Sequence, residues 1–315
     1  MAESRGKVAI IGSGLIGSSW ATIFVSAGYS ICLYDISTNQ LEISKQTILQ
    51  NLQKIKSEGL SRGSTTLEDA PSRISTTMKL DEALADAIYA QESTCEDVEF
   101  KRKIFTEMDR YASSDIVLAS STSTIPASMF TEGLTHRSQC LVAHPVNPPL
   151  YLTLVEMVPA PWTDQNIMSK ACEMMKNIGQ EPVRLHHEVL GFAVNRLQFA
   201  LLAEVWRLVG DDVLSPEDVD KVMSAGLGPR YAIHGPLQTI HLNANGIRDY
   251  LSRYGDGVRR VLADMGPTPT FKESKIVEKL ETSLNQSMPL DQLTSLKSER
   301  ERNLARIASL KKKME

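Results

Sequence analysis

The sequence predicts an α/β protein with a doubly wound sheet in its first part and an all-helical second part. Short apolar runs alternate with helix-period segments over the first 185 residues. This alternation favours a mainly parallel sheet covered by helices. After residue 188 the chain shows helical patterns broken by Gly and Pro, and we find no convincing strand there. We therefore predict two domains, residues 1–188 and residues 189–315.

The expected strands are short apolar runs, and the expected helices repeat their apolar residues at a 3.6-residue period. The strands are predicted at residues 7–11, 29–35, 74–78, 87–92, 116–121, 140–144 and 153–158. Helices of the first part are predicted at residues 15–27, from about residue 38, and at residues 80–87 and 96–112.

The second part opens with residues 191–210, which we expect to form one long, largely buried helix ending at Gly210. Ser215 with Pro216 and Glu217 is a good helix start. The charge-rich tail, residues 297–315, is expected to be a solvated helix.

Composition is that of an ordinary globular protein, with 42% hydrophobic and 23% charged residues. A net charge of −4 gives no reason to expect nucleic acid or a membrane as partner. The first residues mix an apolar stretch with three glycines, which is unlike a signal peptide. The cysteines, at positions 32, 95, 140 and 172, form no C-x-x-C pair. We expect reduced thiols and a cytoplasmic protein.

A glycine motif follows the first predicted strand. Gly12, Gly14 and Gly17 have G-x-G-x-x-G spacing between that strand and a helix. The first glycine permits a tight turn, the second a close approach of backbone N–H groups to a pyrophosphate, and the third close packing of helix on strand. The helix N-terminus favours the phosphate charge. A Rossmann-type dinucleotide site is therefore predicted.

Asp35 ends the second predicted strand, 18 residues after Gly17. An acidic side chain there accepts hydrogen bonds from ribose hydroxyls and repels the extra phosphate of NADP, so NAD is the expected cofactor. Two alternatives stay open. One is an ordinary glycine loop with a helix-capping Asp, and the other is FAD, whose binding uses the same fingerprint.

His144 lies at the carboxyl end of a predicted strand, in "AHPVNPP", where ligands bind in open α/β sheets. Glu156 lies inside the apolar run "TLVEMV", and a buried carboxylate needs a partner. If the two strands are neighbours, Glu156 can fix the imidazole tautomer and raise its basicity. The alternatives are a structural histidine and an edge-strand glutamate facing water.

Two further polar groups stand out. Ser123, in "ASSTSTIP", follows a strand that ends at the same edge of the sheet, although such runs are usually turns or caps. Asn195 lies in the apolar helix "GFAVNRL" and needs partners, of which a substrate oxygen is one. Neither a metal-ligand spacing nor a Ser-His-Asp pattern is present.

Together these motifs resemble the 3-hydroxyacyl-CoA dehydrogenase family over about residues 6–265. The matching stretches are "GSGLIG" with Asp35, "STCEDVEFKRKIF", "SSTST", "AHPVNPP" leading to "LVEMV", and "GFAVNR". The resemblance implies that His144 is the catalytic histidine and Glu156 the carboxylate that orients it. It implies that Ser123 and Asn195 hold the substrate oxygen.

The resemblance also implies a nucleotide-binding role for several residues and a helical C-terminal domain that forms a homodimer. The backbone of Leu15 and Ile16 would lie at the pyrophosphate, and Glu96 and Lys101 would contact the nicotinamide ribose side of NAD. Arg230, in "GLGPRYA", is a speculative anchor for a substrate carboxylate, and a surface or capping role is as plausible.

We therefore predict NAD-dependent oxidation of the 3-hydroxyl of a small polar hydroxy acid, with L-gulonate as the first candidate. The alternatives are a short-chain L-3-hydroxyacyl-CoA and L-carnitine. An alternative of another class is a structural protein that binds NAD without useful turnover.

Overall fold

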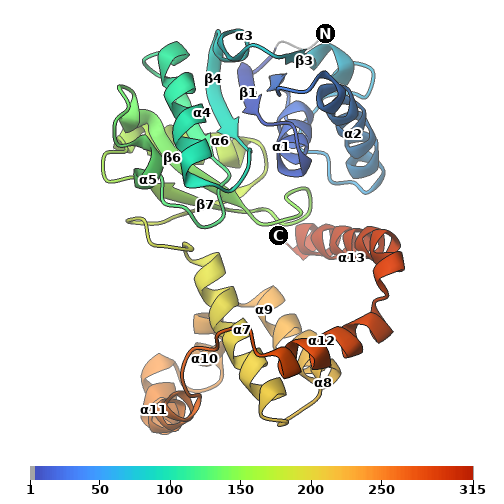
Figure 1. Ribbon diagram of the computed structural model, residues 1–315, viewed down its shortest axis with the longest axis vertical. Helices are drawn as coiled ribbons and strands as arrows, with labels where there is room; N and C mark the ends of the chain where they lie inside the picture. Colours follow the sequence, from blue (N-terminus) through green and yellow to red (C-terminus); the bar gives the residue numbers. More distant parts are fainter. Residues whose placement is uncertain (1–3, 315) are drawn as a thin grey trace. The chain divides into compact units, whose positions relative to one another are not determined.

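The computed structural model describes residues 4–314, and its first part contains an eight-stranded sheet (Figure 1). The strand order is β3-β2-β1-β4-β5-β6-β7-β8. The strands are β1 (Lys7–Ile11), β2 (Ser30–Tyr34), β3 (Ile74–Thr77), β4 (Ala87–Glu92), β5 (Val117–Ser120), β6 (Cys140–Pro145), β7 (Leu154–Pro159) and β8 (Glu181–Arg184). The seven predicted strands are confirmed, with ends that differ by no more than one residue, and β8 is an eighth strand that is not among the predicted ones.

The strands from β3 to β6 all pair in parallel, as the strand–helix alternation predicts. β7 then pairs antiparallel with β6, and β8 pairs parallel with β7. From β1 the chain adds β2 and β3 on one side, and from β4 it adds the later strands on the other side. The order of the strands therefore reverses between β1 and β4. Ligands in this fold bind beyond the carboxyl ends of the strands at such a switch point.

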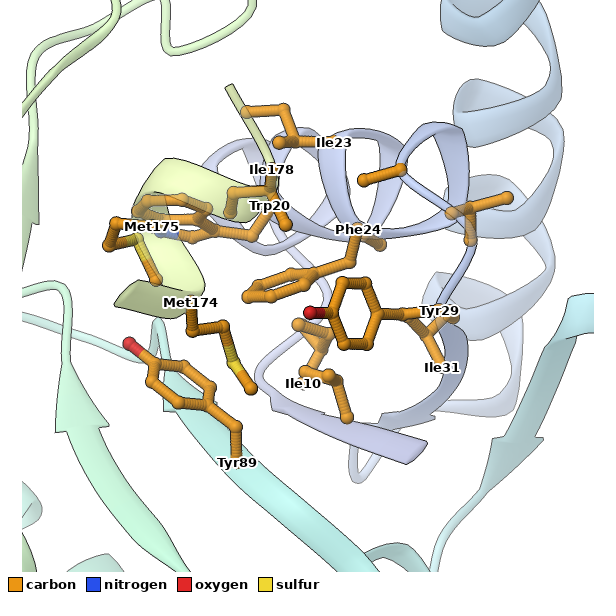
Figure 2. Close-up of a cluster of buried hydrophobic side chains, with 14 of the residues drawn as sticks. Ile10, Trp20, Ile23, Phe24, Tyr29, Ile31, Tyr89, Met174, Met175 and Ile178 are labelled. Atoms are coloured by element: carbon orange, nitrogen blue, oxygen red, sulfur yellow. The ribbon is translucent and has the colours of Figure 1, made fainter. Parts of the chain in front are cut away.

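Helices cover both faces of the sheet and each face has its own hydrophobic core. One face carries α1 (Leu15–Ser26), α2 (Thr38–Ser57) and α6 (Gln165–Asn177). Figure 2 shows this core, in which Trp20 and Phe24 of α1 lie close to Met174 and Met175 of α6. The other face carries α3 (Leu80–Leu84), α4 (Val98–Tyr111) and α5 (Ser128–Thr131). Two 3₁₀ turns, Ala70–Arg73 and Arg137–Gln139, precede β3 and β6.

The C-terminal helix α13 (Leu293–Met314) corrects one expectation, because one side of it is packed rather than solvated. Ala305 is only 3% exposed and joins the same core as α2, with Leu304 and Ala308 packed against it. Lys54 of α2 forms an ion pair with Glu301 at 2.8 Å. By contacts, the chain up to Arg196 therefore groups with the segment from Ser298 onward, and Leu197–Lys297 forms a second unit. The predicted domains 1–188 and 189–315 stay a prediction.

The second unit is helical, and no strand is found in it. It comprises most of α7 (Val194–Gly210), then α8 (Pro216–Lys221), a π-helical turn (Val222–Leu227), α9 (Gly228–Ile233), α10 (Pro236–Leu242), α11 (Ile247–Asp264), α12 (Ser274–Ser287) and a 3₁₀ turn (Leu290–Gln292). Ser215 caps α8 by accepting a hydrogen bond from the Asp218 N–H, as predicted. None of the helices within residues 4–314 is both long and apolar enough to cross a membrane.

The expectation that α7 is largely buried is wrong for the isolated chain. Val209 is its only buried residue, while Leu197 is 70% exposed and Phe199, Leu201 and Leu202 are exposed as well. The apolar sequence that suggested burial is present, but among residues 4–314 these apolar side chains stay exposed.

Candidate active site

The glycine loop between β1 and α1 has the geometry that a dinucleotide requires. A Cβ on Gly17 would lie 2.0 Å from the carbonyl oxygen of Gly12, so only glycine allows the helix to pack this closely. Gly12 has a φ of +92°, and a Cβ there would lie 2.8 Å from the carbonyl oxygen of Ser93. A Cβ on Gly14 would meet nothing within 4 Å. Gly14 thus borders open space at the N-terminus of α1, which suits a pyrophosphate.

Asp35 lies just beyond β2 and binds the glycine loop. Its Oδ2 accepts hydrogen bonds from the Ser13 N–H at 3.0 Å and the Ser13 hydroxyl at 2.9 Å, and its Oδ1 accepts one from the Ser37 N–H at 3.1 Å. The cap of α2 is Ser37, whose side chain accepts from Gln40, so Asp35 is not the capping residue. The half-buried carboxylate retains exposed surface that suits ribose hydroxyls. The glycine loop and Asp35 therefore fit NAD.

His144 and Glu156 face each other across β6 and β7. The two residues are register partners, and His144 Nδ1 lies 2.8 Å from Glu156 Oε2. The predicted adjacency of the two strands is thus confirmed. Glu156 is 1% exposed and β7 has a neighbour on each side, which excludes a water-facing edge glutamate. A carboxylate at Nδ1 favours the tautomer that leaves Nε2 free to accept a proton.

A short elbow, residues 191–195 (GFAVN), leads into the first turn of α7 and lies beside His144. Gly191 has φ +74° and Phe192 φ +50°, a left-handed conformation that is rare for a bulky residue and is held here by its surroundings. Phe192 is fully buried, and its ring centroid lies 5.8 Å from that of His144. The elbow therefore packs directly against the imidazole.

The same elbow supplies backbone donors to Glu156. The N–H groups of Ala193 and Val194 donate to Oε1 at 2.7 Å and 2.9 Å, while Oε2 faces His144. Burial raises the pKa of Glu156, but the hydrogen bonds from His144 and the two N–H groups outweigh it, so this pKa lies below its ordinary value. Glu156 is therefore an anion near neutral pH, suited to stabilise a positive imidazolium.

Residues 121–124, the serine–threonine loop, follow β5 at the same edge of the sheet. Glu96 holds this loop, since its Oε1 accepts from the Thr122 hydroxyl at 2.7 Å, the Ser123 N–H at 2.9 Å and the Thr124 N–H at 3.1 Å. Asn195 Nδ2 donates to the Ser123 carbonyl oxygen at 2.7 Å. The exposed Ser123 and the half-exposed Asn195 are thus brought together, and their role in holding a substrate oxygen stays a prediction.

Comparison with known families agrees with this geometry. Residues 7–189 match the model of the 3-hydroxyacyl-CoA dehydrogenase NAD binding domain, and residues 191–282 match that of the 3-hydroxyacyl-CoA dehydrogenase C-terminal domain. The chain belongs to the 3-hydroxyacyl-CoA dehydrogenase family. Its first part is accordingly an NAD-binding domain, and NAD rather than FAD is the cofactor.

Several relatives of this family member are known. Lambda-crystallin of Oryctolagus cuniculus is 42% identical over 315 residues, covering 99% of this chain and 98% of the relative. L-carnitine dehydrogenase of Oceanobacillus iheyensis is 34% identical over 259 residues, covering 80% and 81%. The solved structure of an NAD⁺-dependent 5-dehydrogenase of a pyridine carboxylic acid has a TM-score of 0.83, with 98% of each chain covered. At 23% identity it supports the fold alone. The protein is an NAD-dependent oxidoreductase that acts on a hydroxy acid.

Lys101 and Glu92 show what sequence reasoning missed in this dehydrogenase. The family resemblance implies that Lys101 contacts the ribose of NAD, and that contact stays a prediction. Its ammonium is buried, 3.0 Å from Glu92 and 3.7 Å from Glu96. Glu92 was not singled out, although an acidic residue that ends the apolar run "AIYAQE" is a usable signal. Because β4 ends at the switch point, this carboxylate lies at the carboxyl edge.

Arg230 belongs to α9 in the second unit, where its side chain is exposed. Its role as an anchor for a substrate carboxylate stays a proposal.

Proposed function

We propose that this protein oxidises the 3-hydroxyl of a small polar hydroxy acid, with L-gulonate as the first candidate. The observation that carries the proposal is the buried His144–Glu156 pair, with its 2.8 Å contact, in a domain built for NAD. A histidine fixed by a carboxylate is a general base matched to neutral pH.

His144 Nε2 takes the proton of the substrate hydroxyl as the carbon–oxygen bond becomes a carbonyl. Glu156 stabilises the imidazolium that forms, and its fixed position keeps the ring oriented. The Ser123 hydroxyl and the Asn195 amide orient the substrate oxygen, and Arg230 is proposed to anchor its carboxylate. NAD, when bound, supplies the acceptor for the hydride that leaves the substrate carbon.

L-Gulonate comes first because the lambda-crystallins match along almost the whole chain, and the motifs "HPVNPP", "RYAIHGPLQTIHLNA" and "GSGLIGSSWA" resemble that protein, which is L-gulonate 3-dehydrogenase. L-Carnitine and short-chain L-3-hydroxyacyl-CoA are the alternatives, supported by the carnitine dehydrogenase relatives and by the family models. These three substrates differ in charge and size, but each carries a 3-hydroxyl from which His144 would take the proton.

A substrate panel tests this proposal. L-Gulonate, L-carnitine and L-3-hydroxybutyryl-CoA are each incubated with NAD, and NADH is followed by its absorbance. We expect the highest kcat/KM with L-gulonate. A higher value for either of the other two would transfer the assignment to that substrate.

A structural NAD-binding protein is the alternative of another class. It would bind NADH, seen as a change in NADH fluorescence, and would turn over no member of the panel. The buried polar contacts among His144, Glu156 and the elbow favour an enzyme, because a structural protein has no evident need to bury them.

We further propose that the protein is a cytoplasmic homodimer. The four cysteines are unpaired, as in reducing compartments. The exposed apolar residues of α7, together with Leu251, Val258 and Leu262 of α11, form surfaces that soluble monomers rarely leave open. Sedimentation velocity is expected to give the mass of two chains, and Leu202→Glu is expected to shift the protein toward one. A wild-type mass of 34.8 kDa would contradict the dimer.

A further inference from the structure

Glu92, the last residue of β4, has no part in the proposed mechanism, yet it is completely buried. Lys101 of α4 is 1% exposed, and its Nζ lies 3.0 Å and 3.1 Å from the two carboxylate oxygens of Glu92. Withdrawing both charges from water costs free energy that their attraction does not always repay, so a buried ion pair is weak evidence of stabilisation. We therefore expect the function of this ion pair to lie in the segments that it holds in place rather than in the stability that it adds.

One end of the pair is bound to the start of the serine–threonine loop. The Ser120 hydroxyl donates to Glu92 Oε2 at 2.5 Å, and the Ser120 oxygen in turn accepts from the Thr122 N–H at 3.2 Å. The backbone carbonyl of Glu92 also accepts from the Ser121 N–H at 2.8 Å. Glu92 thus fixes the point at which the chain leaves β5.

The other end of the pair reaches the same loop through Glu96. The Lys101 ammonium lies 3.7 Å from Glu96 Oε2, while Glu96 Oε1 holds the hydroxyl of Thr122 and the N–H groups of Ser123 and Thr124. One buried cation is therefore shared by two carboxylates. If Glu92 loses its charge, the attraction of Lys101 falls on Glu96 alone and draws that carboxylate away from the loop.

We propose that Glu92 is a positioning residue for the substrate oxygen. By holding Lys101, it leaves Glu96 at the backbone of the serine–threonine loop, and this sets Ser123 against Asn195. The inference rests on the proposed function for its effect on catalysis, and the geometry of the loop tests it separately.

The first measurement is amide hydrogen exchange of the loop in Glu92→Gln, a substitution that removes the charge and keeps the shape. The amides of Ser123 and Thr124 are expected to exchange about tenfold faster, since each loses its hydrogen bond to Glu96. In Glu92→Gln/Lys101→Met nothing pulls Glu96 away, and the protection is expected to return. This readout does not depend on turnover, so it remains valid if the substrate panel is negative.

The second measurement is kcat with the preferred substrate at saturating NAD. Glu92→Gln is expected to lower it about 10–100-fold, the range for a misplaced orienting group, and Lys101→Met added to it is expected to restore part of the loss. Gln139→Leu is the matched control, because Gln139 is buried in the same unit and donates to the carbonyls of Ser113 and Ile116, away from the loop. Its kcat is expected to stay at the wild-type value.

Unchanged loop exchange in Glu92→Gln overturns the proposal, whatever happens to activity. A double variant whose kcat is lower than that of Glu92→Gln also overturns the proposal, because a purely structural pair would be damaged further by losing its second member. If Glu92→Gln does not fold, Glu92→Asp keeps the charge and is expected to retain the protection of Ser123 and Thr124, and rapid exchange of these amides in a folded Glu92→Asp overturns the proposal.

Discussion

Replacement of His144 by Gln is expected to lower kcat for the preferred hydroxy acid by about 10²–10⁴-fold, the usual contribution of general acid–base catalysis. Gln keeps a polar side chain of similar reach, so Glu156 retains a hydrogen-bond partner, but an amide has no nitrogen that takes a proton near neutral pH. The affinity for NADH, followed by fluorescence titration, is expected to change little, because the glycine loop and Asp35 are untouched.

His136→Gln is the matched control for this experiment. His136 also places Nδ1 beside a carboxylate, at 2.9 Å from Asp109 Oδ1, but it precedes β6 and is not at the carboxyl ends of the strands. The control is expected to keep the wild-type kcat. If His144→Gln turns over as fast as the wild type, His144 is not the base and the proposed mechanism fails.

Most of the sheet, the glycine loop and the contact between His144 and Glu156 could be predicted because they depend on sequence that is close together along the chain. Each strand is an apolar run, and the glycine spacing constrains the backbone directly, as the 2.0 Å approach at Gly17 demonstrates. The partnership of His144 with Glu156 was predictable because only twelve residues separate them and a proline-rich turn lies between. Helix α6 is not among the predicted helices, although its buried residues have helical spacing, at Met168, Ala171, Met174 and Met175.

The missed features depend on contacts between distant segments. Lys54 and Glu301 are 247 residues apart, so nothing local in the tail indicates that α13 packs on the first unit. The buried state of Lys101 likewise depends on where β4 ends relative to α4. The prediction that α7 is largely buried is wrong for another reason. Its apolar residues indicate that a surface must be covered, and composition alone cannot tell whether the same chain covers it.

Replacement of Glu156 by Gln is expected to lower kcat by about 10³–10⁴-fold, because it moves the ring proton of His144 from Nδ1 to Nε2 and so gives the wrong tautomer. The N–H groups of Ala193 and Val194 point at Oε1, so the amide oxygen of Gln is held there and its NH₂ group faces Nδ1. Nδ1 must then accept, the ring proton moves to Nε2, and the nitrogen that should take the substrate proton is already protonated. Glu188→Gln is the control, since Glu188 accepts the Ser128 N–H at 3.2 Å and has no other hydrogen bond within residues 4–314.

The same variant has a second expected effect, on the pH dependence of stability. Because the pKa of Glu156 is lower in the folded protein than its ordinary value, the ionised form stabilises the fold above the ordinary carboxyl pKa. This stabilisation is lost as the pH falls through the folded-state pKa, and Gln abolishes that dependence. Denaturant unfolding across the acid range is expected to give a flatter curve for Glu156→Gln than for the wild type. A variant that loses activity but keeps the wild-type pH dependence of unfolding would mean that Glu156 is not the paired anion, and the tautomer argument would fail with it.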